Sequence, residues 1–335
     1  MDALSWFDSH TSTASDWSMT ALLKGKGKTK ISVVLPALNE AETIGSIIAT
    51  IRNELMQDQP LIDEIVVIDG ASSDQTAEVA TRAGARVFAH DLIITGLDAL
   101  PGKGEAMWRS LFCTSGEIIV FLDADLKNFT ATYVTGLLGP LLTDPGIDLV
   151  KGFYERPTSI SDEQMDQGGT AGSTADSIFG AGGGRVTELV ARPLLNLHWP
   201  ELSGVIQPLA GEYAARRSLL EKLPFPTGYG IELALLVDTV SLRGLSALAQ
   251  VDLGERVHRH QDLQALGRMA TEIWQVALDR LDRDGRIVLI DEPQTTLTQF
   301  TATQAGHQAY RNDMSIVQRP PAISLAQYRD LQPIN

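Results

Sequence analysis

The sequence predicts an α/β fold in which a mostly parallel sheet carries helices on both faces. Three observations indicate this class. Apolar runs alternate with segments of helical period between residues 31 and 153, as they do in βαβ units. Several of these runs end at Pro or Asp, where a buried parallel strand would pass into a loop. The chain has 335 residues, 44% hydrophobic and 21% charged, which suits one large domain or two small ones.

The first strand and helix set the pattern that the following elements repeat. Residues 31–35 form a continuous apolar run that ends at Pro36, which is typical of a buried parallel strand. The helix that follows is indicated by apolar residues on one face, at Ile44, Ile47, Ile48, Ile51 and Leu55. The same alternation predicts strands at 64–68, 86–89, 117–122 and 148–153, and helices at 73–83, 102–115 and 132–142.

The pattern changes after residue 153. Residues 158–184 are rich in Gly, Ser, Thr and Asp and predict a long polar loop. Beyond this loop we expect helices at 185–197, 231–240 and 262–281 and a strand at 247–251. The expected organisation is an N-terminal arm (1–30), two subdomains (31–153 and 154–281) and an irregular C-terminal tail (282–335).

The chain is acidic, with 27 Lys and Arg against 42 Asp and Glu and a net charge of −15. This charge disfavours nucleic acid and anionic membrane surfaces as partners, although adaptation to high salt would give the same composition. The single cysteine, Cys113, excludes an intrachain disulfide. No apolar run approaches the roughly 20 residues of a membrane helix. We therefore expect a soluble, cytoplasmic protein, in which the lysine-rich residues 24–30 form a solvated arm.

Four polar segments follow predicted strands or precede a predicted helix, at 36–40, 69–74, 101–105 and 123–125. Each of them alone could be a turn, a helix cap or a glycine-rich corner. Ligands of open parallel sheets bind beyond the carboxyl ends of the strands. Four such segments in one half of the chain therefore indicate a binding site.

Two of these segments carry specific chemistry. Asp123 and Asp125 follow an apolar strand, and their spacing places both carboxylates on one side of an extended chain. Carboxylate oxygens suit a hard divalent cation that bridges a diphosphate, although one aspartate could instead cap a helix. Lys103 lies between two glycines at a helix N-terminus, which suits phosphate, although it could also be an exposed lysine in a flexible corner.

Residues 33–40, 67–76 and 121–125 resemble, in order, the three landmark motifs of nucleotide-sugar glycosyltransferases with the GT-A fold. Four further segments resemble the retaining family of glucosyl-3-phosphoglycerate synthases, at 101–110, 182–195, 207–215 and 228–232. The resemblance covers about residues 31–275. It implies a GT-A-type, Rossmann-like sheet in which 31–153 bind the nucleotide sugar and 154–281 bind the acceptor. It also implies transfer of glucose from UDP-glucose to the 2-hydroxyl of 3-phosphoglycerate with retention, by a homodimer.

The resemblance implies a role for each matching residue. The donor would be bound by Pro36, Ala37, Leu38, Asn39, Glu40, Ser72, Lys103, Asp123, Ala124 and Tyr229. The metal, Mg²⁺ or Mn²⁺, would be ligated by Asp125 and His258. The catalytic group would comprise Glu232, Asp123, Leu209 and Arg256. The acceptor would be bound by Gly184, Arg185, Thr187 and His260.

The acceptor segment also has support from its residue types. Gly184, Arg185 and Thr187 combine a glycine turn, a guanidinium, a hydroxyl and a helix N-terminus, which together suit an anion. The alternative is a capped helix with a surface arginine. Two positions depart from the pattern we expect of the family: His260 stands in place of asparagine, and Ala124 in place of serine. The second departure leaves the donor open.

Several alternatives therefore remain open. The enzyme could use GDP-mannose as a mannosyl-3-phosphoglycerate synthase, or it could accept both donors. A catalytically silent sugar-nucleotide-binding protein is a more remote alternative. For the mechanism we favour front-face substitution, because Glu232 is the one candidate nucleophile and we expect it to bind sugar hydroxyls instead.

Overall fold

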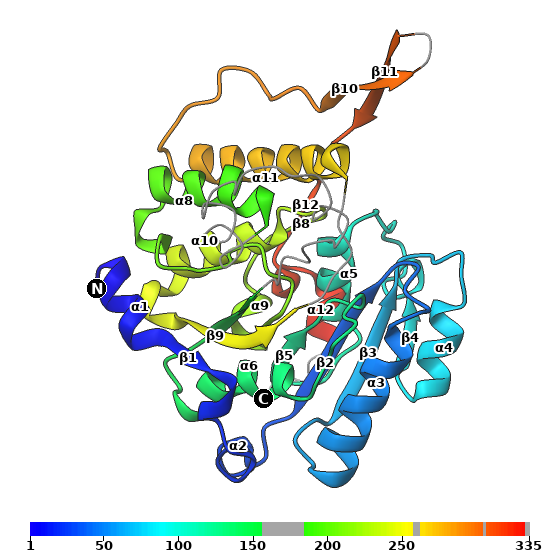
Figure 1. Ribbon diagram of the computed structural model, residues 1–335, viewed down its shortest axis with the longest axis vertical. Helices are drawn as coiled ribbons and strands as arrows, with labels where there is room; N and C mark the ends of the chain where they lie inside the picture. The colour runs from blue at the N-terminus through cyan, green and yellow to red at the C-terminus, as the bar shows by residue number, and fades with distance from the viewer. Residues whose placement is uncertain (156–183, 257–261, 304–305, 332–335) are drawn as a thin grey trace, which may run out of the picture.

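An eight-stranded sheet forms the centre of the computed structural model, which describes residues 1–155, 184–256, 262–303 and 306–331 (Figure 1). Its strand order is β1-β9-β6-β7-β5-β2-β3-β4. All neighbouring strands are parallel except β7, which is antiparallel to both β5 and β6. The predicted fold class is confirmed. The strands are β1 (Thr11–Thr13), β2 (Ile31–Ala37), β3 (Glu64–Asp69), β4 (Arg86–Ala89), β5 (Ile118–Phe121), β6 (Leu149–Glu155), β7 (Tyr213–Arg216) and β9 (Leu248–Glu255).

Helices cover both faces of this sheet (Figure 1). The α-helices are α1 (Ala3–His10), α2 (Met19–Lys26), α3 (Ile44–Arg52), α4 (Thr76–Ala83), α5 (Lys103–Ser110), α6 (Thr132–Thr143), α8 (Arg192–His198), α9 (Arg217–Leu220), α10 (Ile231–Arg243), α11 (Leu263–Arg283) and α12 (Ala326–Leu331). Short 3-10 or π turns are η1 (Ala14–Asp16), η2 (Asn53–Asp58), η3 (His90–Leu92), η5 (Thr187–Ala191), η6 (Pro200–Leu202), η7 (Leu245–Ala247) and η8 (Ala322–Ser324).

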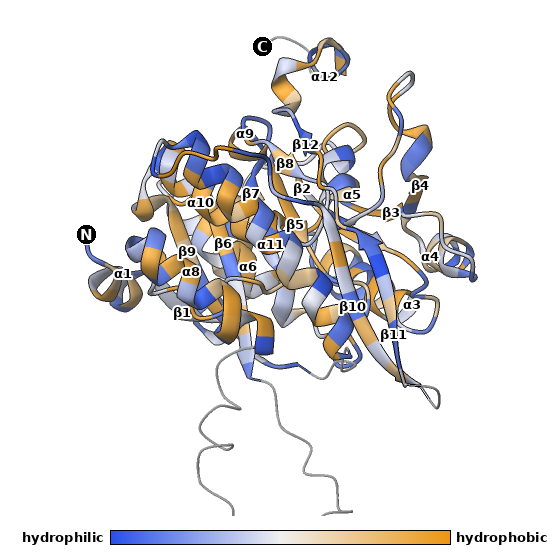
Figure 2. Cartoon of the chain, turned by 90° about the horizontal axis from the view of Figure 1, so that it is seen from above, coloured by the Kyte–Doolittle hydropathy of each residue, from blue (hydrophilic) through white to orange (hydrophobic). Residues whose placement is uncertain are grey.

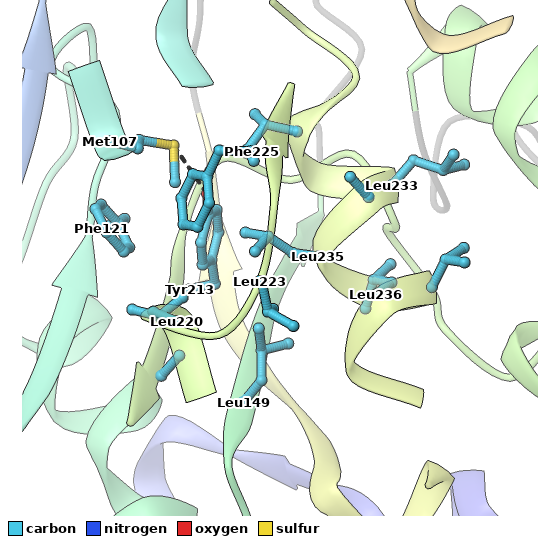
Figure 3. Close-up of a cluster of buried hydrophobic side chains, with 14 of the residues drawn as sticks. Met107, Phe121, Leu149, Tyr213, Leu220, Leu223, Phe225, Leu233, Leu235 and Leu236 are labelled. Atoms are coloured by element: carbon cyan, nitrogen blue, oxygen red, sulfur yellow. Dashed lines mark hydrogen bonds between the residues drawn. The ribbon is translucent and has the colours of Figure 1, made fainter. Parts of the chain in front are cut away.

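The core consists of two hydrophobic clusters, one on each face of the sheet. Because side chains alternate along a strand, β2 sends Val33 and Leu35 into one cluster and Val34 into the other. The first cluster packs under α3 and α6, and the second under α5, α10 and α11. Figure 3 shows part of the second cluster, where the Tyr213 hydroxyl donates to the Met107 sulfur at 3.0 Å. Figure 2 shows the hydrophobic residues along the interior strands and their alternation with hydrophilic residues along the helices.

The N-terminal segment is part of the fold, so the expectation that residues 1–30 form an arm before the fold was wrong. β1 pairs in parallel with β9 at the edge of the sheet. The Trp6 indole is 1% exposed and donates to the Leu248 carbonyl at 2.9 Å, and Leu22 is fully buried. Lys24 and Lys26 lie in the last turn of α2, where cations stabilise a helix end. The elements here are too short to show a clear hydrophobic period.

The C-terminal segment is also structured, so the expectation of an irregular tail was wrong. Strands β10 (Thr296–Thr303) and β11 (Gly306–Asp313) form a hairpin that projects beyond α11 (Figure 1). Strand β12 (Gln318–Arg319) pairs antiparallel with β8 (Phe225–Pro226). Arg319 and Tyr328 are buried. Tertiary contacts, rather than local pattern, determine these elements.

Most of the predicted loop at 158–184 lies outside the described residues. The single sheet takes strands from three of the four predicted segments, and the division of the chain into subdomains stays a prediction. Among the described residues, no helix is long and apolar enough to cross a membrane.

Candidate functional site

Two loops meet beyond the carboxyl ends of β2 and β3, where the sequence predicts the nucleotide. Pro36 and Ala37 are the last residues of β2, and the side chain of Leu38 is 57% exposed. Asn39 follows with φ of 60°, a left-handed conformation that Asn tolerates better than most residues. The Asn39 amide donates to the Ser72 hydroxyl at 2.9 Å. The first two predicted donor segments therefore lie side by side.

Hydrogen bonds fix the shape of this pair of loops. The Asn39 side-chain oxygen accepts from the Ser73 amide at 2.8 Å, and the Glu40 amide donates to the Thr76 hydroxyl at 2.8 Å. Asp69, at the end of β3, accepts from the Ser72 amide at 3.2 Å. Its other oxygen, Oδ1, is buried without a hydrogen-bond partner. Such an orphaned acceptor at a strand end is suited to a donor group on a ligand.

Three elements bring together the charged centre of the site. Asp123 follows β5, Lys103 opens α5, and Glu232 lies in the first turn of α10. The Lys103 ammonium lies 2.6 Å from Asp123 Oδ1 and 2.8 Å from Glu232 Oε1. These residues are far apart in the sequence, and the sheet edge brings them into direct contact.

Arg256 extends the charged centre from the end of β9. Its Nη2 donates to Asp123 Oδ2 at 3.1 Å and to Asp125 Oδ1 at 2.9 Å. Its Nη1 donates to Glu212 Oε1 at 2.9 Å and to the Tyr154 hydroxyl at 2.6 Å. Both aspartates of the 123–125 motif thus face one guanidinium. Lys103, Glu232, Arg256 and these carboxylates form a single network, which we call the charged cluster.

The charged cluster shifts the pKa values of its members. Burial alone would raise the pKa of Asp123, but Lys103 and Arg256 overcome this and hold it well below its usual range. Burial would lower the pKa of Lys103, but the charges of Asp123 and Glu232 raise it well above its usual value. Both groups are therefore ionised at neutral pH, and Lys103 acts as a fixed cation rather than as a proton donor.

Three residues of the site were missed at the sequence level. Glu212 is fully buried, and burial raises its pKa to about 7, against the opposing effect of Arg256. Gly211 packs against Asp123 so closely that a β-carbon would overlap its carboxylate. Lys151 is buried in β6, donates to the Ala210 carbonyl and lies 4.6 Å from the centre of the Tyr213 ring. A lysine is rarely buried, so its presence within the apolar run of β6 was a sequence signal for Lys151.

The remaining predicted residues flank the charged cluster. Ala124 is buried, and its carbonyl accepts from the Thr43 hydroxyl at 2.6 Å. Leu209 is half-buried, one residue before the carbonyl that Lys151 contacts. Tyr229 is 46% exposed, and its amide donates to Glu272 Oε2 at 2.6 Å. Tyr229 therefore presents its ring at the surface, three residues before Glu232.

The predicted acceptor residues lie at the start of a helix. Gly184 precedes it, Arg185 is exposed in its first turn, and Thr187 is buried at the start of η5. Glu188 pairs with Arg192 one turn further on, at 2.8 Å. The sequence prediction of a cation, a hydroxyl and a helix start in one short segment matches this geometry. His260 lies outside the described residues.

The described residues contain one of the two predicted metal ligands, Asp125, while His258 lies outside them. In the part of the chain that the structure describes, no group of three His, Cys, Asp or Glu side chains could hold a metal by itself. The charged cluster nevertheless contains four carboxylates paired with two cations. Such an excess of oxygen ligands with negative charge fits a hard divalent cation.

The site combines a mostly parallel sheet, two aspartates after β5 and the two loops beyond β2 and β3. This combination is typical of glycosyltransferases of the GT-A type. The model of glycosyl transferase family 2 matches residues 32–165. A glucosyl-3-phosphoglycerate synthase from Petrotoga mobilis is 43% identical over 92% of this chain and 90% of its own. The chain belongs to the family of glucosyl-3-phosphoglycerate synthases.

Solved structures agree with this assignment. The structure of glucosyl-3-phosphoglycerate synthase from Mycobacterium tuberculosis with Mn²⁺, UDP and phosphoglyceric acid is 42% identical, with a TM-score of 0.78. It covers 92% of this chain and 95% of that one. The structure of mannosyl-3-phosphoglycerate synthase from Rubrobacter xylanophilus is 38% identical, with a TM-score of 0.84, and covers 97% of this chain and 98% of that one. Relatives of both names therefore share the fold over nearly the whole chain.

Proposed function

We propose that this enzyme transfers glucose from UDP-glucose to the 2-hydroxyl of 3-phosphoglycerate with retention of configuration. The observation that carries the proposal is the charged cluster, which places Lys103 and Arg256 on both sides of Asp123. Departure of UDP develops negative charge on a phosphate, and fixed cations aimed at that charge lower the barrier. Relatives with 43% and 42% identity carry the same named activity.

The donor would lie along the two loops beyond β2 and β3. The Asp69 oxygen without a partner offers a hydrogen bond to a ribose or a base. The cluster residues Asp125 and, from outside the described range, His258 would hold a divalent cation, Mg²⁺ or Mn²⁺. When bound, this cation would neutralise charge on the diphosphate. The Mycobacterium tuberculosis relative was solved with Mn²⁺ or Mg²⁺ together with UDP.

Retention would proceed by front-face substitution. The acceptor oxygen bonds to the anomeric carbon on the face that the phosphate leaves, and the departing phosphate oxygen takes the hydroxyl proton. Glu232 is the candidate for a nucleophile on the opposite face, but its carboxylate is paired with Lys103 at 2.8 Å. We propose that Glu232 binds sugar hydroxyls and Lys103. If Glu232→Gln traps no covalent adduct and retains appreciable turnover, a nucleophilic role is excluded.

The acceptor would bind at the helix start that carries Arg185 and Thr187. A guanidinium and the amides at a helix start suit the phosphate and carboxylate of 3-phosphoglycerate, and they supply local positive charge in an acidic chain. In this proposal residues 31–153 bind the donor and 154–281 bind the acceptor.

A panel of donors and acceptors tests the function. UDP-glucose, GDP-glucose, GDP-mannose and UDP-mannose are each incubated with 3-phosphoglycerate or with glycerate, with and without Mg²⁺, and the product is identified by NMR. We expect transfer of glucose to 3-phosphoglycerate with an α-linkage, which depends on the metal. No transfer to 3-phosphoglycerate from any donor would refute the proposal. Efficient use of GDP-mannose would favour the second candidate, for which the Rubrobacter xylanophilus relative is the supporting observation.

We further propose a cytoplasmic homodimer. The single cysteine agrees with a reducing compartment. Exposed apolar side chains occur along the C-terminal segment, at Val288, Ile290 and Phe300, each more than 60% exposed. Such side chains on one segment favour contact with a second copy. Light scattering on the purified protein distinguishes a mass of about twice 36.2 kDa from the monomer mass.

A further inference from the structure

Arg319 lies in the C-terminal strand β12, outside every segment that carries the predicted site. Its side chain is almost fully buried and makes two hydrogen bonds to one carboxylate. Nε donates to Glu105 Oε2 at 2.6 Å, and Nη2 donates to Glu105 Oε1 at 2.8 Å. Nη2 also donates to the Asp98 carbonyl at 2.7 Å. Paired contacts of this kind fix orientation as well as distance.

Glu105 lies two residues after Lys103 in the first turn of α5. Its carboxylate also accepts from the Leu100 amide at 3.3 Å and from Arg109 at 2.6 Å. Arg319 therefore holds the helix start and, through Asp98, the loop that leads into it. Lys103 lies within this held segment, and its ammonium reaches Asp123 and Glu232.

The C-terminal segment also contacts the part of the chain that leads to Glu232, the second carboxylate partner of Lys103. β12 pairs with β8, and the Thr227 amide donates to the Val317 carbonyl at 3.0 Å. The Thr227 carbonyl in turn accepts from the Glu105 amide at 3.2 Å. Residues 228–230 then lead directly into α10, which carries Glu232. Residues 317–319 thus contact Glu105 at the start of α5 and Thr227, which lies four residues before α10.

We propose that Arg319 is a positioning residue for sugar transfer, which sets the place of the Lys103 ammonium by holding Glu105. The expected change in kinetics rests on the proposed function. The claim that Arg319 positions Lys103 does not, because it concerns the place of the Lys103 ammonium alone. Loss of one partner of a buried ion pair commonly destabilises a fold, so a structural role alone would lower stability without acting through Lys103. The two roles separate in a double-mutant cycle.

The variants are Arg319→Lys, Lys103→Met and the double variant, with Arg280→Lys as the matched control. Arg280 is also fully buried and pairs with carboxylates, those of Asp238 and Asp279, each at 2.8 Å. Arg319→Lys keeps the charge but loses the paired geometry, so the fold is retained where Arg319→Met could fail. All measurements are made well below the melting temperature of each variant.

Two readouts are measured. The first is the dissociation constant of UDP with Mn²⁺, together with kcat and KM for UDP-glucose. We expect Arg319→Lys to weaken UDP binding about tenfold and to lower kcat/KM by about ten- to a hundredfold. We expect little further effect of Arg319→Lys when Lys103→Met is already present, and no effect of Arg280→Lys. Equal effects of Arg319→Lys with and without Lys103 would overturn the proposal.

The second readout does not depend on the function. The rate at which an amine-reactive reagent labels Lys103 is measured by mass spectrometry in the protein without ligands. We expect several-fold faster labelling in Arg319→Lys, because the ammonium would leave its two carboxylates more often, and an unchanged rate in Arg280→Lys. An unchanged rate in Arg319→Lys would overturn the positional claim. If the donor panel shows no transfer while labelling responds, the proposed function fails and the positional claim stands.

Discussion

The backbone of Gly211 lies against the carboxylate of Asp123, so that a β-carbon at position 211 would overlap both carboxylate oxygens. Asp123 in turn contacts Lys103 and Arg256, the two cations of the charged cluster. The lack of a side chain at position 211 therefore leaves room for the carboxylate of Asp123. The same glycine precedes Glu212, whose buried carboxylate contacts Arg256 from the other side.

We expect Gly211→Ala to lower kcat/KM by about a hundredfold, since displacement of a catalytic group by about 1 Å has effects of that order. The loss should appear mainly in kcat and in donor binding, because Asp123 would move away from Lys103. Steady-state kinetics with both substrates measures this. Gly146→Ala, in an exposed turn before β6, is the control and should behave like the wild type. Normal activity of Gly211→Ala would show that the Asp123 position is not critical.

Lys103→Met removes the cation that lies between Asp123 and Glu232. Loss of one electrostatic donor from an active site reduces kcat by about 10²–10³-fold, and we expect a reduction in this range. Lys103→Arg should retain part of the activity, because the charge remains but the shape does not. A reduction of less than about threefold for Lys103→Met would remove Lys103 from the leaving-group role.

Arg185→Gln tests the acceptor site separately from the donor site. We expect KM for 3-phosphoglycerate to rise at least about tenfold, with KM for UDP-glucose unchanged, because an ionic contact to a phosphate contributes about 1.5–3 kcal/mol. Arg192→Gln, about two turns beyond on the same helical segment, should leave both values near those of the wild type. A rise in both KM values would place Arg185 outside a specific acceptor site.

Lys151→Met tests a buried charge through the pH dependence of stability. Burial lowers the pKa of Lys151 to about 8, from 10.5 in an exposed lysine. Between these two values the unfolded chain binds a proton that the folded chain does not. This group therefore makes the free energy of unfolding rise with pH, by about 3 kcal/mol in total.

We expect the variant to lack this rise, so its stability relative to the wild type should fall between about pH 7 and about pH 10. Urea denaturation at both pH values measures the change. Lys222→Met, at an exposed position, is the control. Its difference from the wild type in free energy of unfolding should be the same at both pH values. Parallel pH profiles for the wild type and Lys151→Met would contradict the prediction.

Asp125→Asn tests metal binding in the charged cluster. Asn keeps the shape of the side chain but removes the charge that both Arg256 and a divalent cation require. We expect the Mg²⁺ concentration for half-maximal activity to rise at least about tenfold, with residual activity restored by excess metal. Chelation with EDTA should abolish wild-type activity. Activity that is insensitive to chelation would refute a metal role for this residue.

The sequence was sufficient to predict six of the eight strands of the central sheet, and the family resemblance added most of the charged cluster. Buried parallel strands read as continuous apolar runs, so the strand predicted at 31–35 is found as β2, which begins at Ile31 and is buried at all but one of its positions. A polar residue at the end of such a run pointed to Asp123, because the carboxyl ends of parallel strands share one edge. Lys103 was indicated by its place between two glycines at a helix N-terminus. The contacts of both residues with Glu232 and Arg256 required the fold, since these residues come from α10 and β9.

The parts that were missed depend on tertiary contacts. β7 is antiparallel, four residues long and carries two alanines, so it has neither a long apolar run nor a clear alternation. Glu212 would be read as a surface residue from its type alone, yet Arg256 makes its burial possible. The C-terminal strand β12 has two residues and exists only because it pairs with β8.

The pairing of β1 with β9 has a consequence for the solubility of shortened chains. β1 has three residues and ends the sheet on this side, and Trp6 caps it through the Leu248 carbonyl. A protein that starts near residue 30 would leave the backbone of residues 250–252 in β9 without its partner strand. Such an edge pairs with strands of other molecules. The first residues therefore cover this sheet edge, and a chain that lacks them should be less soluble.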